Sequence, residues 1–307
     1  MRIILLITAT MIWGFGFVAT RWTLNGFDPI WSNSIRFVFA GLFALPVLLI
    51  KREIRPTVAS GVCSLLLLAG LLLQTIGISQ TTLAKSGFFT TFYALFTPLL
   101  IALLFRQKFR LGYWGLLLIS LLGVALLCEL SWEGFNQGDG FILASAFLFA
   151  MHIIAIDRLA QEESPIIFNL QQCLYVGLMG IPLALVLSGV PDVGQLWDWE
   201  SLIPPGVLAG FLFLSLFSSI GAFTVQVYVQ QKIPAHIVSL IFLTESVFGA
   251  LFGYMFFGEK LSLMGLGGAF LILMSVSLIP ILTNYEKKRL SRGDHLSSAA
   301  TEPASCN

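Results

Sequence analysis

Charged side chains are scarce in this chain of 307 residues. Asp, Glu, Lys and Arg make up 11% of it, hydrophobic residues make up 57%, and the mean hydropathy is +0.90. Soluble domains carry about 25% charged residues, and a soluble monomer of this composition would expose larger apolar patches than soluble monomers tolerate. The composition therefore excludes a cytosolic enzyme and a disordered protein. A net charge of only +1, with no basic patch before the last apolar run, also excludes a nucleic-acid partner. We interpret the chain as an integral membrane protein whose surroundings are the lipid bilayer.

Histidine and cysteine are also rare, with three and four residues respectively. The cysteines, at positions 63, 128, 173 and 306, form no Cys-x-x-Cys pair, so we interpret them as packing residues. No second histidine or carboxylate stands three or four positions after His152, where a metal site on a helix would need one. The glycines of WGFGF do not follow a predicted strand, whereas those of a nucleotide-binding loop do. We therefore expect no metal site and no cofactor.

Ten apolar runs are each long enough to cross a bilayer core, which takes about 20 residues in a helix. They leave short connections and a polar tail, with no room for a second, soluble domain. The first run could pass for a signal peptide, but no small-residue cleavage site separates it from an equally apolar continuation. The runs predict ten transmembrane helices, over residues 3–20, 31–50, 59–79, 86–105, 112–130, 137–156, 167–187, 205–229, 236–257 and 262–283.

Lysine and arginine are unevenly distributed between the two ends of these helices. With the N-terminus in the cytoplasm, the cytoplasmic segments hold 13 of these residues and the outer connections hold three, while Arg36 lies inside the run 31–50. Cytoplasmic loops of membrane proteins carry the excess of positive charge. The distribution therefore predicts a multi-pass protein of a prokaryotic plasma membrane, with both termini in the cytoplasm.

The ten predicted helices divide into two sets of five near residues 133–138. Because five is odd, the second set enters the membrane from the opposite side, and the segments around RQKFR and GEKLS look alike. We expect an all-α integral membrane protein with ten transmembrane helices in two inverted five-helix repeats, residues 1–134 and 135–283, followed by a disordered cytoplasmic tail, 284–307. Inverted repeats are typical of secondary transporters, whose substrate site lies near the midplane between the repeats.

Several stretches together resemble the drug/metabolite transporter superfamily, in particular its EamA-type ten-helix exporters. They occur in the family's order and are IWGFGFVATRW (12–22), DPIWSNSIRFVFAGL (28–42), LLQTIGISQTTLAKSGFFTTFYALFTPLL (72–100), GDGFILASAFLFAMHIIAIDRLA (138–160) and LIFLTESVFGALFGYMFFGEKLS (240–262). The resemblance implies a carrier of two intertwined repeats that exports small metabolites by alternating access, as a monomer or weak homodimer. The chain departs from the family at Ser246, where proline often follows the glutamate, so the resemblance implies no kink there.

Two ionisable residues within predicted helices are the first candidates for a substrate or coupling-ion site. Burying a charge in a membrane helix costs about 2.5–3.5 kcal/mol, so such residues usually face the protein interior. Glu245, near the middle of the run 236–257, matches the family's glutamate. It is either a proton or cation site or a structural acid bonded to a neighbouring helix. Arg36 matches the family's Arg-Phe pair and could attract a substrate carboxylate, or instead snorkel outward or pair with a carboxylate or a helix end.

Polar and aromatic residues inside the apolar runs complete the candidates. His152 could relay protons or simply be a satisfied hydrogen-bonding residue. Lys85, at the outer start of the run 86–105, could line the site or anchor a helix at the membrane interface. Pro98 could kink its helix near a cavity. The remaining candidates could contact substrate or hold helices together, and they are Trp13, Gln74, Thr90, Tyr93, Gln172 and Gln226.

The sequence favours a secondary transporter, not an enzyme, that exports a small metabolite or amphipathic solute. Proton coupling through Glu245 is a further hypothesis, beside a structural role for this residue. Its expected partners are a small-molecule substrate and the lipid bilayer. Two alternatives stay open. One is a membrane-embedded enzyme acting on a lipid, although the loop near 188–204 lacks the histidine or cysteine that such a site would use. The other is a non-catalytic membrane assembly partner.

Overall fold

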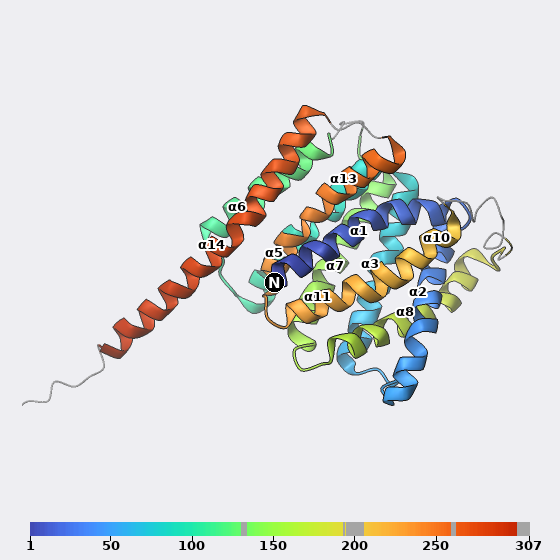
Figure 1. Cartoon of the computed structure of the whole chain (residues 1–307), viewed down its shortest axis with the longest axis horizontal. Helices are drawn as coiled ribbons and strands as arrows, with labels where there is room; N and C mark the ends of the chain where they lie inside the picture. The colour runs from blue at the N-terminus through green and yellow to red at the C-terminus, as the bar shows by residue number, and fades with distance from the viewer. Residues whose placement is uncertain (130–133, 193, 195–205, 259–261, 300–307) are drawn as a thin grey trace, which may run out of the picture.

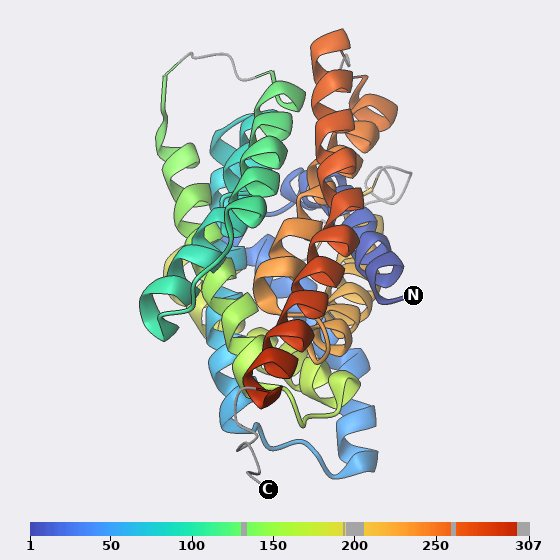
Figure 2. The ribbon, with the colours of Figure 1, turned by 90° about the vertical axis from the view of Figure 1, so that its left-hand side faces the viewer.

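The computed structural model describes residues 1–129, 134–192, 194, 206–258 and 262–299. These residues form helices and no strand, as the sequence predicts, and Figure 1 shows the helices packed into one bundle. Figure 2 shows the same helices running roughly lengthwise beside one another. The first half contains α1 (Arg2–Leu24), α2 (Pro29–Lys51), α3 (Val58–Gln80), α4 (Leu83–Thr90), α5 (Tyr93–Phe105) and α6 (Leu111–Leu127). The second half contains α7 (Gln137–Leu159), α8 (Pro165–Ser188), α10 (Val207–Leu212), the π-helix η2 (Phe213–Ala222), α11 (Phe223–Gln230), α12 (Ala235–Phe242), α13 (Thr244–Phe257) and α14 (Leu263–Ala299).

Ten segments of this chain cross the membrane. In the described part of the chain, nine helical stretches are long and apolar enough to span a bilayer, and α6 is a shorter apolar helix. Three of the nine are built from consecutive helices: α4 with α5, α10 with η2 and α11, and α12 with α13. Each half therefore contributes five spans, and the protein is an all-α integral membrane protein.

The contacts between helices follow the symmetry of two inverted repeats. The second and seventh spans, α2 and α8, pack on each other, and so do the fifth and tenth, α6 and α14. The third span α3 packs on α7, and its counterpart in the second half, the span containing η2, packs on α1. Exchanging the halves thus maps the first two contacts onto themselves and the last two onto each other, as a two-fold relation between repeats requires.

The helices α2 and α8 also show the repeat in their sequences. Seven residues of α2 recur in α8, each 136 positions later, and they include Pro29 and Pro165, Asn33 and Asn169, Gly41 and Gly177, and Pro46 and Pro182. The prolines occupy the first turn and the interior of both helices. The side chain of Asp28 caps the start of α2 by accepting hydrogen bonds from two backbone N–H groups of its first turn.

The fourth and ninth spans are both interrupted near their middle. The break between α4 and α5 lies at residues 91–92, and the break between α12 and α13 lies at Leu243. Hydroxyl groups compete for the backbone there: Thr244 donates to the carbonyl of Ile241, and Ser246 donates to the carbonyl of Leu243. The ninth span is therefore broken without the proline that the family often has, while Pro98 lies inside the continuous helix α5.

The last helix continues into the polar tail, residues 284–307. The structure continues α14 to Ala299 and so includes much of residues 284–307. The physical reason lies in the composition, because the run EKKRL, residues 286–290, consists of good helix formers. Figure 1 shows the end of α14 projecting beyond the rest of the bundle.

Candidate functional site

A cavity of about 80 Å³ lies where the two halves meet. Its lining includes residues near the middle of α1, α3, α7 and the π-helix η2, together with residues beside both breaks. Aromatic and aliphatic side chains form most of its wall. The cavity also brings together eight of the ten candidate residues, which are Trp13, Arg36, Gln74, Thr90, Tyr93, His152, Gln226 and Glu245.

Glu245 and Tyr93 occupy corresponding places in the two broken spans. Tyr93 is the first residue of α5 and Glu245 the second of α13, and they are 152 positions apart. The same separation relates Arg106 and Gly258, which follow these two helices with φ values of 54° and 66°. The Tyr93 hydroxyl donates to Glu245 Oε2 over 3.4 Å. A carboxyl group thus meets a phenol across the boundary between the repeats.

Arg36 is held by the second half of the chain and not by an acid. The side chain is 7% exposed, its Nε donates to Ser219 Oγ and its Nη2 to Ser218 Oγ, both over 2.8 Å. The hydroxyl of Ser215 in turn donates to the Arg36 carbonyl over 2.7 Å. Among the described residues the ion pairs are Lys85 with Asp139 and Arg158 with Asp157, so none involves Arg36. The arginine neither snorkels outward nor pairs with a carboxylate.

A row of amides supports the polar part of the cavity. His152 Nε2 and Gln172 Oε1 lie 2.9 Å apart, and Gln172 stands behind the histidine without lining the cavity itself. Gln74 donates to the Thr90 hydroxyl over 3.2 Å, and Gln226 donates to the side chain of Gln230 over 2.7 Å. The first two contacts join side chains of different spans, whereas Gln226 and Gln230 lie one turn apart in α11.

Three aromatic rings meet at one wall of the cavity. The ring of Trp13 lies between those of Phe223 and Phe242, with centroid distances of 5.0 and 4.9 Å. The Trp13 indole N–H is buried and has no hydrogen-bond acceptor among the described residues. This tryptophan therefore combines a large apolar face at the cavity with a buried donor that is unused.

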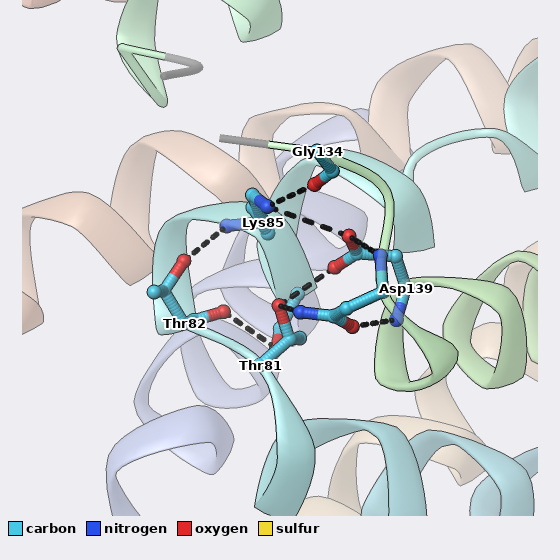
Figure 3. A network of polar contacts seen from close by, with 7 residues as sticks. Thr81, Thr82, Lys85, Gly134 and Asp139 are labelled. Atoms are coloured by element: carbon cyan, nitrogen blue, oxygen red, sulfur yellow. Dashed lines mark hydrogen bonds and ion pairs between the residues drawn. The ribbon is translucent and has the colours of Figure 1, made fainter. Parts of the chain in front are cut away.

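Lys85 lies outside the cavity, in a separate network at one end of the bundle (Figure 3). Its ammonium group contacts Asp139 Oδ2 at 3.5 Å and donates to the Gly134 carbonyl over 2.9 Å. Asp139 also accepts a hydrogen bond from the Thr81 hydroxyl over 2.6 Å and one from the Asn136 N–H over 3.0 Å. The network joins the α3–α4 turn to the start of α7, so Lys85 connects the two halves there and contributes no wall to the cavity.

Sequence reasoning missed the serines that hold Arg36. Ser218 lines the cavity and Ser219 is fully buried, both in the π-helix η2. The run SLFSSIGAF offers three serines in an apolar stretch, which is the available signal. It is weak because serines also serve ordinary helix packing in membranes. In the described part of the chain no group of three or more His, Cys, Asp or Glu side chains is placed to hold a metal ion.

Two inverted repeats of membrane helices around a midplane cavity define the architecture of a secondary transporter. The sequence pattern of the EamA-like transporter family matches residues 1–128 and 136–281, and the chain belongs to this family. The protein is a multi-pass membrane transporter.

Relatives are similar over most of their length. An uncharacterized transporter of Archaeoglobus fulgidus is 26% identical over 88% of this chain and 83% of its own. The uncharacterized inner membrane transporter YedA of Escherichia coli is 26% identical over 82% of this chain and 81% of its own. A WAT1-related chloroplastic protein of Arabidopsis thaliana is 24% identical over 89% of this chain and 68% of its own. One solved crystal structure has a TM-score of 0.72 at 16% identity, covering 92% of this chain and 98% of the other, which shows the common fold.

Proposed function

We propose that this transporter exports a small solute across the plasma membrane by alternating access, with the midplane cavity as its substrate site. The observation that carries the proposal is the cavity itself, because both repeats contribute its wall and polar side chains gather there inside an otherwise apolar bundle. Rocking of one repeat against the other would open such a site to each side in turn. The breaks in the fourth and ninth spans supply places where this motion can bend the helices.

The test is solute flux in sealed vesicles that contain the purified protein. We expect uptake or counterflow of a labelled solute without added nucleotide, because a secondary carrier draws on gradients alone. Turnover of a lipid without solute flux would support the membrane enzyme instead. Absence of both, with a stable partner recovered from the native membrane, would support the assembly role.

Proton coupling through Glu245 is the second part of the proposal. Its support is the position of the carboxyl group, which lines the cavity and accepts a hydrogen bond from Tyr93 of the other repeat. We expect Glu245→Gln to remove the pH dependence of flux while the protein keeps its fold. Glutamine preserves the shape of the side chain but cannot bind and release a proton. Flux is measured at several pH values with and without a proton gradient.

Glu129→Gln is the matched control for this substitution. Glu129 follows the end of α6, is exposed, and accepts a hydrogen bond from the Ser262 N–H over 3.3 Å, away from the cavity. The control should keep the wild-type pH profile. A Glu245→Gln protein with the wild-type profile would contradict proton coupling at this residue, and a Glu245→Gln protein that fails to fold would assign Glu245 a structural role.

A further inference from the structure

Arg36 is a buried cation whose charge nothing in the described part of the chain neutralises. Its two hydrogen-bond acceptors, Ser218 and Ser219, are neutral hydroxyl groups, and its guanidinium carbon lies 5.2 Å from the centre of the Phe37 ring. Hydroxyls satisfy single N–H groups but do not replace a counter-charge. A buried ion normally needs a partner of opposite sign, because its transfer out of water is costly.

The free donors of Arg36 have the geometry that a carboxylate requires. A guanidinium group carries five N–H donors in a rigid fork, and the two serines take one from Nε and one from Nη2. Three remain, and they include both N–H groups of Nη1 and the second N–H of Nη2. A pair of N–H groups on Nη1 and Nη2 can bind the two oxygens of one carboxylate end-on.

A second unpaired donor belongs to a side chain of the cavity wall. The Trp13 indole N–H is buried without an acceptor, and Trp13 lines the cavity together with Arg36 and Ser218. Unpaired buried donors are rare in native proteins and ask for an explanation. Phe17, Phe149 and Phe223 form apolar wall nearby. The combination suits a small molecule with one anionic group and an apolar body.

We propose that Arg36 and Trp13 bind the carboxylate of the transported solute, so that the substrate class is small monocarboxylates with an apolar body. This inference rests on the proposed function, since it concerns the same cavity. A phosphate ester fits less well, because a dianion needs more positive charge than one arginine supplies and the cavity also contains Glu245.

The test compares matched ligands on the purified full-length protein. The probes are 3-phenylpropionate and hexanoate, with their neutral amides as controls, and the readout is the melting temperature, which rises when a ligand binds only the folded state. We expect stabilisation by the acids and not by the amides. Arg36→Gln should weaken acid binding about 10- to 100-fold, as expected for the loss of a charge-assisted hydrogen bond, whereas Arg36→Lys should retain part of it.

Arg21→Gln is the matched control, because Arg21 is also a membrane-helix arginine but lies outside the cavity and donates to the Thr81 carbonyl over 3.1 Å. It should bind the acids as the wild type does. Equal stabilisation by acids and amides, or no stabilisation by either acid, would overturn the inference even if Arg36→Gln fails to fold. Flux of other solutes in vesicles would then show that the protein is a transporter although its substrates are not monocarboxylates.

An independent observation concerns Asn33 and its counterpart Asn169. Asn169 Nδ2 donates to the carbonyls of Ser219 and Ile220, over 2.9 and 3.0 Å, in the π-helix η2. Asn33 is 2% exposed, and neither its Nδ2 nor its Oδ1 has a partner among the described residues. The two asparagines hold corresponding positions in α2 and α8, yet only the second is satisfied.

The spans that follow α2 and α8 differ as well. A π-helix leaves carbonyl groups outside the ordinary helical pattern, and η2 interrupts the eighth span, whereas its counterpart α3 is a continuous α-helix. A continuous α-helix keeps its interior carbonyls bonded within the helix. We infer that the repeats exchange these geometries during transport. In the opposite-facing state α3 forms the wide turn and Asn33 binds its carbonyls, while η2 becomes regular and Asn169 is released.

Substitution of each asparagine by leucine tests this exchange. Asn33→Leu removes an unsatisfied amide and should leave thermal stability unchanged or higher, while it lowers flux about tenfold by disfavouring the opposite-facing state. Asn169→Leu should lower stability and populate that state. The populations are measured by labelling single cysteines placed at Ile78 and at Gln226, with an impermeant reagent added to one side at a time. An Asn33→Leu protein that is destabilised as much as Asn169→Leu, or that transports like the wild type, would overturn the inference.

Discussion

At the scale of single residues, the buried carboxylate of Asp139 is the centre of a polar network at one end of the bundle. It is fully buried and combines an ion pair with Lys85, a hydrogen bond from the Thr81 hydroxyl and a capping interaction with Asn136 (Figure 3). Its removal leaves these donors unsatisfied. We expect Asp139→Ala to lower the free energy of unfolding by about 1–3 kcal/mol, measured as a lower melting temperature in detergent.

The control for this substitution is Asp192→Ala. Asp192 is exposed, and its described hydrogen bond is one to the Gly194 N–H over 3.0 Å. The melting temperature of the control should match the wild type. Equal melting temperatures for Asp139→Ala and the wild type would show that the network in Figure 3 adds nothing to stability.

At the scale of helices, α6 and α14 approach each other through two glycines. A Cβ atom on Gly123 would lie 2.7 Å from the Gly268 carbonyl oxygen, and a Cβ on Gly268 would clash with the Gly123 carbonyl oxygen. Gly268→Ala should therefore push α14 away from α6 and lower the melting temperature by several degrees. The adjacent Gly267 has open space at its Cβ, so Gly267→Ala should be neutral. A neutral Gly268→Ala would mean that this pair of helices separates without cost.

The helices themselves could largely be predicted from the sequence, because an uninterrupted apolar run in a membrane has few structural alternatives to a helix. The breaks could not. Leu243 separates α12 from α13 beside the hydroxyls of Thr244 and Ser246. Thr10 and Ser145 make the same kind of hydrogen bond inside the continuous helices α1 and α7. The π-helix η2 likewise has no sequence pattern that distinguishes SLFSSIGAF from an ordinary helix.

The cavity residues show the same division. Polar groups in apolar runs are expected to face the interior, which is why Glu245, Arg36 and His152 could be selected from the sequence alone. Their partners could not be selected. Ser218 is 182 positions from Arg36, and only the packing of α2 against η2 brings the two together. Lys85 stands at the start of an apolar run, and the structure places it in the first turn of α4, where it bonds Asp139.

At the scale of the whole molecule, the orientation in the membrane follows from charge. The described end of the bundle that carries Arg52, Arg106 and Arg158 is opposite to the end that carries Arg21 and Lys85, since each charge lies at a known end of its span. Because cytoplasmic loops hold the excess of Lys and Arg, we expect the Arg106 end to face the cytoplasm.

Single cysteines at Arg106 and at Thr82, in a protein whose native cysteines are replaced by serine, test this orientation in whole cells. An impermeant thiol reagent outside the cell should label the cysteine at 82 and leave the one at 106 unlabelled until the membrane is opened. The reverse pattern would contradict the orientation, and with it the direction of export, while the inverted repeats and their cavity would remain as described.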